Sequence, residues 1–344
     1  MSEAAASFSA RHPVLVARLR QLAGPALVAA FVVLLLPGPL IGRRPASWDH
    51  VVHYTKAVSF IHRLPSLDLW GWDWSQYAGY PTEYGYPLTA EVAVAAVFAT
   101  ALGTISIGHA YALAFFCAYL FGAAVVYWTF SRWIGRIAAA VTVFFYLTDF
   151  GDFFIGGWFF TVLFGVWPVF LSISFGLLFA ERLVAFVGDR AAVSPVALGA
   201  LLGVTLLSHP MQLVLVPLTS VATALWVVCE ADLRHQATLM RAQRGAVVAI
   251  PLAAALAAFW YGPFLANAAF TQDRGSPGTA PLTLLTGLVT GHAFAKMVPV
   301  AAWAGLAGAV GLCVVRGRAR LIGLACVVGL VAMTSIPRDR KSVV

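Results

Sequence analysis

The sequence predicts an all-α membrane protein, a polytopic bundle of about nine transmembrane helices. Its 344 residues are 61% hydrophobic and only 10% charged, with a mean hydropathy of +0.86. A soluble domain cannot bury that much apolar surface. The apolar runs, such as residues 26–41, are long and do not alternate with polar residues. Because backbone groups in lipid must be satisfied within helices or a closed barrel, such runs favour helices.

The charge pattern indicates topology rather than a nucleic-acid partner. The net charge is +8, but the basic residues occur in ones to threes between apolar runs and form no basic face. Arg11, Arg18 and Arg20 predict that residues 1–21 are a cytoplasmic N-terminus and that the span 22–41 leads outside. The cysteines occur singly and form no CxxC motif, so neither a zinc site nor a disulfide framework is indicated.

The apolar stretch 88–107 decides the topology of everything after it. If it crossed the membrane, the later arginine clusters would fall outside, so we expect it to lie on the outer face or dip into it. Glu91, one turn into the stretch, also fits a helix that does not face lipid. The first external loop is then 42–108 and the second is 148–158. The remaining predicted spans are 109–130, 137–148, 158–180, 194–208, 211–228, 246–265, 298–315 and 321–335.

The transmembrane module is expected over residues 22–338, followed by a short foreign tail. Residues 339–344 read DRKSVV, which is what a common sequencing-adapter oligonucleotide encodes immediately before a stop codon. We therefore expect this tail to be non-native and the natural chain to continue beyond about residue 338.

The first external loop contains the most unusual stretch, residues 47–87. Four of the eleven tryptophans, five of the ten tyrosines and four of the fourteen acids lie in it. An aromatic belt at the membrane interface would account for the rings, but less well for the interleaved acids. Rings that stack on sugar faces, beside carboxylates that accept hydroxyl hydrogen bonds, are typical of a sugar-handling site. The candidate stacking residues, beside Gly-Tyr-Pro and Tyr-Pro turns, are Trp74, Tyr80, Tyr84 and Tyr86.

Asp49, eight residues after the first span, is the leading catalytic candidate. An outward-facing carboxylate here could act as a general base or, with His50 or His53, as a metal ligand. The alternative is structural, because Ser47 and Asp49 would suit the N-terminus of an interfacial helix over 48–63. His50 and His53 are also candidate substrate-binding residues.

The second external loop offers the acid pair Asp149 and Asp152. Acids near bilayer depth need solvent, a partner or a metal, so Asp152 is a second catalytic candidate, whereas the alternative is a helix cap. Asp49, Asp149 and Asp152 are together the candidate ligands of a divalent cation, Mg²⁺ or Mn²⁺.

Two further residues are candidate substrate ligands. His209 precedes Pro210, a pair that more often marks a helix end. Arg274 could hold a lipid phosphate or form a solvated pair with Asp273. The sequence has no Gly-rich nucleotide loop, GxSxG or HExxH motif, so a sugar donor would be lipid-borne and used on the outer face.

The order of these motifs resembles the GT-C glycosyltransferase superfamily over residues 40–270. It is most similar to prokaryotic membrane proteins labelled "6-pyruvoyl-tetrahydropterin synthase-related". The similarity rests on an early acid with histidines, two aromatic proline turns, a G-x-x-P, an L-x-H-P and an F-W-x-x-P-F. The residues are Asp49, His50, His53, Trp74, Gly79, Tyr80, Pro81, Tyr86, Pro87, Gly165, Pro168, Leu207, His209, Pro210, Phe259, Trp260, Pro263 and Phe264. The acid spacing D-x-x-D departs from the D-x-D or D-x-E of the oligosaccharyltransferase.

The resemblance implies a GT-C-like fold and a membrane glycosyltransferase that uses a polyprenyl-phosphate-linked sugar in cell-envelope glycan assembly. It implies the plasma membrane of a prokaryote and Asp49 as catalytic acid/base or metal ligand. Two rivals stay open: a transporter or lipid-linked-sugar flippase, and a non-catalytic scaffold of envelope assembly. A transporter would favour internal repeats and charges at mid-membrane, whereas the acids of this sequence lie in loops.

Overall fold

The computed structural model confirms the all-α class. It describes residues 13–69, 71–73, 80–81, 87–149, 157–188, 193–230, 236–266, 286 and 299–335. In this part, the regular structure is helical apart from one antiparallel pair of two-residue strands, β1 (Trp72–Asp73) and β2 (Tyr80–Pro81). The expected tail 339–344 lies outside the described residues.

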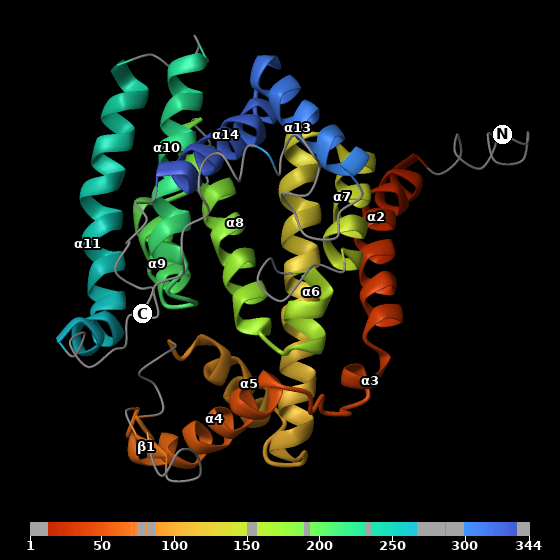
Figure 1. Ribbon diagram of the computed structural model, residues 1–344, viewed down its shortest axis with the longest axis vertical. Coiled ribbons are helices and arrows are strands. Elements are labelled where there is room, and N and C mark those ends of the chain that lie inside the picture. The colour runs from red at the N-terminus through yellow and green to blue at the C-terminus, as the bar shows by residue number, and fades with distance from the viewer. Residues whose placement is uncertain are drawn as a thin grey trace, which may run out of the picture.

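Seven of the described helices, from α2 to α11, run along the long axis of a bundle, whereas α13 and α14 lie obliquely at one end (Figure 1). These nine helices are α2 (Pro13–Leu35), α6 (Ile107–Trp133), α7 (Arg136–Thr148), α8 (Trp167–Val187), α9 (Pro195–Leu206), α10 (Gln212–Cys229), α11 (Gln236–Ala266), α13 (Pro299–Val314) and α14 (Ala319–Ser335). Within the described ranges, four helical segments are long and apolar enough to cross a membrane: Ile107–Trp133, Trp167–Val187, Gln212–Cys229 and Thr238–Ala266. The count of nine spans stays a prediction.

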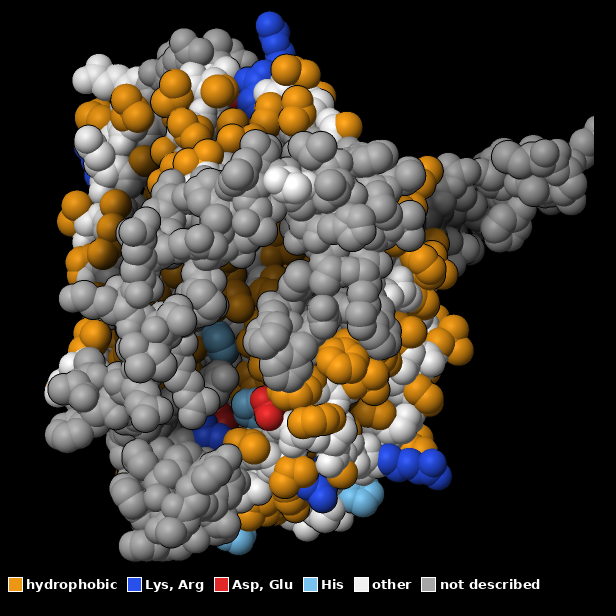
Figure 2. Space-filling view, in the orientation of Figure 1, with side chains coloured by type: hydrophobic (Ala, Val, Ile, Leu, Met, Phe, Trp, Pro, Cys, Tyr) orange, Lys and Arg blue, Asp and Glu red, His pale blue; other side chains and the backbone are white. Residues whose placement is uncertain are grey.

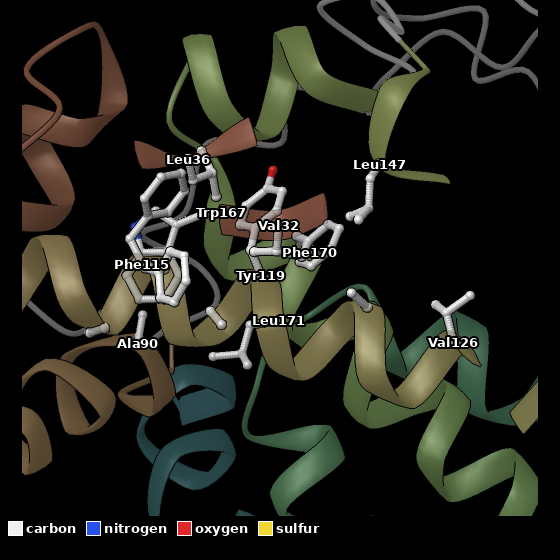
Figure 3. Close-up of a cluster of buried hydrophobic side chains, with 14 of the residues drawn as sticks. Val32, Leu36, Ala90, Phe115, Tyr119, Val126, Leu147, Trp167, Phe170 and Leu171 are labelled. Carbon is white, nitrogen blue, oxygen red and sulfur yellow. The ribbon is translucent and has the colours of Figure 1, made fainter. Parts of the chain in front are cut away.

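The core forms around α6, which packs against α2, α5, α7 and α8. Figure 3 shows Phe115 and Tyr119 of α6 beside Trp167 and Phe170 of α8. The rings of Tyr119 and Phe170 stack with their centroids 4.1 Å apart. Gly122 permits this approach, because a Cβ there would lie 2.3 Å from the Phe170 ring. The two helices are therefore held in a fixed register.

Three short helices connect α2 to α6 at one end of the bundle. They are α3 (Pro37–Leu40), α4 (Asp49–Arg63), which continues into the 3₁₀ turn η1 (Leu64–Ser66), and α5 (Thr89–Thr100). The 12 residues of α5 extend about 18 Å, well short of the ~30 Å hydrocarbon core. The helices α4 and α5 lie at the lower end in Figure 1, where α6 also begins. This arrangement is what a non-spanning stretch 88–107 requires.

The opposite end gathers the arginines that the charge pattern assigned to one side of the membrane. Arg132, Arg182 and Arg318, from three different parts of the chain, all lie within 4 Å of the Glu181 carboxylate. This convergence agrees with their predicted placement on one side. Which side faces the cytoplasm stays a prediction.

Candidate functional site

Five ionisable side chains gather between α4, α5 and the turn that joins α9 to α10. We call them the histidine cluster: His50, His53, Lys56, Glu91 and His209. On α4, positions 50, 53, 56, 57 and 60 are buried, a spacing that places them along one helical face. Figure 2 shows histidine, acidic and basic side chains together in a recess near α4 and α5. The cluster therefore lies where the loop helices cover the end of the bundle.

A chain of hydrogen bonds fixes His50. The Nε2 atom lies 2.8 Å from the Val162 carbonyl oxygen, which can only accept, so Nε2 carries the proton. The Nδ1 atom then accepts from the Tyr111 hydroxyl at 2.9 Å, and that hydroxyl accepts from the Trp167 indole N–H at 2.9 Å. Burial lowers the pKa of His50, in agreement with a neutral ring. Because both ring nitrogens are used, His50 anchors α4, and this favours a positioning role over direct substrate binding.

The beginning of α4 is held by the end of the π-helix η2 (Phe159–Leu163) and by the residue that follows it. The Asp49 amide donates to the Phe164 carbonyl at 2.9 Å, and the Ser47 hydroxyl donates to the Leu163 carbonyl at 2.6 Å. The Trp48 ring stacks on Phe164 with centroids 5.2 Å apart. In the structural alternative, Ser47 would support the N-terminus of this helix; its hydroxyl instead donates to a distant segment, and no side chain caps α4.

Gly165 allows this close contact. Its φ is +97°, a conformation that other residues rarely adopt, and a Cβ there would lie 2.4 Å from the His50 backbone nitrogen. Trp167 and Pro168 then begin α8 in the first-turn position that proline tolerates. The Gly-x-x-Pro motif thus has a structural role: it brings the start of α8 against the start of α4.

Asp49 is half-buried at the first residue of α4, beside the histidine cluster. Burial raises the pKa of its carboxyl, which makes the carboxylate a stronger proton acceptor. His53 lies one turn further along the same helix, the spacing at which side chains are neighbours. Asp49 can therefore present a carboxylate beside a buried imidazole. Its first-turn position also favours the helix dipole, so the structural alternative is not removed.

In the rest of the cluster, His53, Lys56 and Glu91 are buried and His209 is half-buried, and the lysine and the glutamate balance each other's charge. Burial, followed by the nearby charges of Lys56, His50 and His209, lowers the pKa of His53 to about 3, and burial lowers that of His209 to about 4. Both imidazoles are therefore neutral at pH 7. Lys56 Nζ lies 3.8 Å from Glu91 Oε1, with side chains only 3% and 1% exposed. The pair compensates two charges that would be costly alone at this depth.

The turn that carries His209 is attached to α5. The Thr89 hydroxyl, at the first residue of α5, donates to the Leu207 carbonyl at 2.6 Å. The His209 ring accepts from the Met211 amide at 3.1 Å through Nδ1. The Leu-x-His-Pro motif therefore reaches the cluster because its backbone binds α5.

The acids of the second loop do not form a metal site within the described ranges. Asp149 follows α7, is exposed, and accepts from the Trp158 amide at 2.8 Å through its carbonyl. It also borders a cavity of about 190 Å³ with Tyr119, Tyr146 and Thr161. Among the described residues, no three His, Cys, Asp or Glu side chains gather as a metal ligand set. Asp152, the third predicted ligand, lies outside these ranges.

The other predicted site residues lie in β2 or outside the described part of the chain. Trp74, Tyr84, Tyr86 and Arg274 are outside it. The backbone of Tyr80 forms β2 and pairs with Asp73. Their predicted contacts with a substrate stay predictions.

The sequence did not assign Lys56, Tyr111, Trp167 or Glu91 to a site. Lys56 shares the helical face of His50 and His53, six and three residues on, so the helical period could have identified it. Glu91 indicated only that α5 avoids lipid. Tyr111 and Trp167 lie in apolar helices, and no local signal distinguishes them from core residues.

Comparisons with known proteins supply no relative. No protein-family model matches the sequence, and no curated protein and no solved structure matches it.

Proposed function

We propose that this chain is a GT-C-type integral membrane glycosyltransferase that uses a polyprenyl-phosphate-linked sugar at the outer face of a prokaryotic plasma membrane. The observation that carries the proposal is the place of Asp49. Its half-buried carboxylate, with a raised pKa, stands beside a cluster of neutral histidines at one end of the bundle. The family resemblance supplies the reaction class.

In the proposed reaction, Asp49 accepts the proton of an acceptor hydroxyl. That hydroxyl oxygen attacks the anomeric carbon, and the bond from that carbon to the phosphate oxygen breaks. The polyprenyl phosphate leaves with the bonding electrons. Neutral His53 and His209 would offer hydrogen bonds to sugar hydroxyls without introducing charge.

Arg44 is a candidate for the donor phosphate. Its guanidinium lies 3.9 Å from the centroid of the Tyr54 ring on α4 and acts electrostatically on His50. The side chain is exposed, so an incoming phosphate can reach it. Arg44→Gln is expected to raise KM for the donor more than it lowers kcat, because the phosphate contact exists before transfer.

The distribution of charge in the spans disfavours the transporter alternative. In Ile107–Trp133, Trp167–Val187, Gln212–Cys229 and Thr238–Ala266, every Asp, Glu, Lys and Arg lies in the first or last two turns. A carrier that moves a charged substrate would be expected to place such groups near mid-membrane.

The test is the lipid-linked sugar that accumulates in cells carrying Asp49→Asn. Asn keeps the size of the side chain but removes the charge, and loss of a general base lowers turnover by about 10²–10⁴-fold. We expect Asp49→Asn to accumulate the same donor as a gene deletion, at normal protein level. The matched control is Asp68→Asn, which removes an exposed acid from the same loop and should behave as wild type.

The position of the accumulated donor separates the alternatives. A transferase defect leaves the lipid-linked sugar accessible from outside, whereas a flippase defect leaves it on the cytoplasmic leaflet. A scaffold would show accumulation on deletion but none with Asp49→Asn. Either of the last two outcomes would refute the proposal.

A further inference from the structure

The end of the bundle opposite the histidine cluster carries a group of arginines, which we call the arginine cluster: Arg132, Arg182 and Arg318. They surround Glu181, whose side chain is 2% exposed, at N–O distances of 3.7, 3.4 and 3.9 Å. Direct charge-assisted hydrogen bonds are about 2.7–2.9 Å long, so the carboxylate is shared loosely among the three. Three guanidinium groups therefore converge on one carboxylate.

A fourth arginine nearby belongs to a different contact. Arg320 also lies at this end, but its guanidinium is 3.0 Å from Glu230 and bonds the carbonyls of Cys313 and Cys229. That pair is matched, and it attaches α14 to the end of α10. The arginine cluster differs, because its three guanidinium groups share the single carboxylate of Glu181, and the excess positive charge favours an anionic ligand.

An aromatic ring holds two of the arginines in place. The guanidinium carbons of Arg132 and Arg182 lie 3.7 and 4.3 Å from the centroid of the Trp128 ring. The side chains of Arg132 and Arg182 are each 34% exposed and that of Arg318 is 16% exposed. The three are thus partly ordered by the protein and still within reach of a ligand at the membrane surface.

An apolar cavity of about 250 Å³ adjoins the arginine cluster. Its wall includes Trp133, which follows Arg132, and Leu177, one turn before Glu181 on α8. It also includes Leu321 and Ile322, one turn after Arg318. Positive charge at the end of the helices and an apolar cavity beside it match a molecule with an anionic head and a hydrocarbon tail.

We propose that the arginine cluster and this cavity bind an anionic phospholipid, with its phosphate between the three guanidinium groups and part of an acyl chain in the cavity. Glu181 orders the arginines and at the same time limits the affinity for the lipid. A zwitterionic phospholipid should bind more weakly, because its ammonium group offsets the attraction between its phosphate and the arginines. The proposal is independent of the activity proposed for the opposite end.

The test compares lipids by their effect on the thermal unfolding of the full chain in a neutral detergent. Phosphatidylglycerol should raise the unfolding midpoint with a saturable dose, whereas phosphatidylcholine and glycerol phosphate at equal concentration should not. Arg318→Gln should weaken the apparent affinity for phosphatidylglycerol by about fivefold, since each arginine near anionic lipid contributes roughly 1 kcal/mol. Arg316→Gln removes an exposed arginine two residues away and should leave that affinity unchanged.

Two more variants separate the parts of the site. Glu181→Gln should strengthen phosphatidylglycerol binding, because it removes the competing carboxylate. Ala325→Phe places bulk in the cavity and should weaken binding without abolishing folding, as Ala325 is exposed on one side. Equal stabilisation by phosphatidylcholine or glycerol phosphate, equal loss in Arg316→Gln and Arg318→Gln, or weaker binding in Glu181→Gln would overturn the proposal.

Discussion

At the end where α4 and α5 lie, the ionisable side chains are buried and balanced, whereas at the opposite end three partly exposed arginines share one carboxylate. Lys56 and Glu91 are 3% and 1% exposed, whereas Arg132 and Arg182 are each 34% exposed. Burial makes a charge expensive, so the first end keeps its histidines neutral and pairs its lysine. At the second end, contact with solvent lowers the cost of placing three arginines close together. The buried and paired groups at the first end therefore agree with the reaction site proposed there, and the partly exposed arginines at the second end agree with the lipid site proposed there.

The largest expected effect comes from breaking the buried pair. Glu91→Gln removes the carboxylate 3.8 Å from a buried Lys56 and should destabilise the fold by about 3–5 kcal/mol. The measurement is thermal or denaturant unfolding in detergent. The double variant Lys56→Met, Glu91→Leu should recover most of that loss. If Glu91→Gln alone is as stable as wild type, the comparison of buried with exposed charge fails.

Acid should destabilise the histidine-cluster end. The folded pKa values of His53 and His209, about 3 and about 4, lie below the unfolded value of 6.5, so the unfolded chain binds more protons. The stabilisation is present above pH 6.5 and is lost as pH falls toward about 4 for His209 and about 3 for His53. Each histidine contributes at most roughly 1.4 kcal/mol per pH unit, or about 3 kcal/mol per unit for both. His53→Gln should reduce the slope of the unfolding midpoint against pH. An unchanged slope would mean that His53 is not buried neutral.

Removing one hydroxyl should loosen α4. Tyr111→Phe leaves the His50 Nδ1 and the Trp167 indole N–H without their shared partner and should cost about 2 kcal/mol. The control is Tyr146→Phe, since the buried Tyr146 hydroxyl finds no hydrogen-bond partner among the described residues and its loss should be nearly neutral. Equal effects of the two changes in an unfolding assay would argue against the hydrogen-bond chain.

The smallest effect is expected at the arginine end. Arg182→Gln weakens a contact of 3.4 Å in which the arginine is 34% exposed, so the free energy of unfolding should change by less than about 1 kcal/mol without added lipid. The change should shrink further in high salt. A loss as large as that of Glu91→Gln would show that both ends store stability in the same way.

The helix class and many helix limits could be predicted from the sequence, because they depend on local patterns. Two predicted spans were wrong in their limits: 158–180 is the π-helix η2 followed by α8 (Trp167–Val187), and 246–265 is part of α11, which begins at Gln236. The short stretches 137–148 and 194–208 form Arg136–Thr148 and Pro195–Leu206, and Gly135 and Pro195 mark two of the boundaries. The non-spanning interpretation of 88–107 came from arginine parity, and α5 is short enough to satisfy it.

The contacts inside the candidate site could be predicted from the sequence only in part. Asp49, His50 and His53 could be named because they share one short helix next to an unusual loop. The hydrogen-bond partners of His50 could not be predicted, since Tyr111 and Val162 lie 61 and 112 residues further along the chain. Which polar groups meet in a core depends on helix packing, and no local pattern encodes it.

The contacts that close the site also set when it can form. The start of α4 is completed by Leu163 and Val162, 116 and 112 residues later, and α5 by Leu207, 118 residues after Thr89. At a synthesis rate of about 5–20 residues per second, these partners are made roughly 6–24 seconds after the residues that need them. During that interval the polar face of α4 lacks its native lining. A nascent chain is thus most exposed to misassembly or proteolysis between the synthesis of its first loop and that of Leu207, which follows α9.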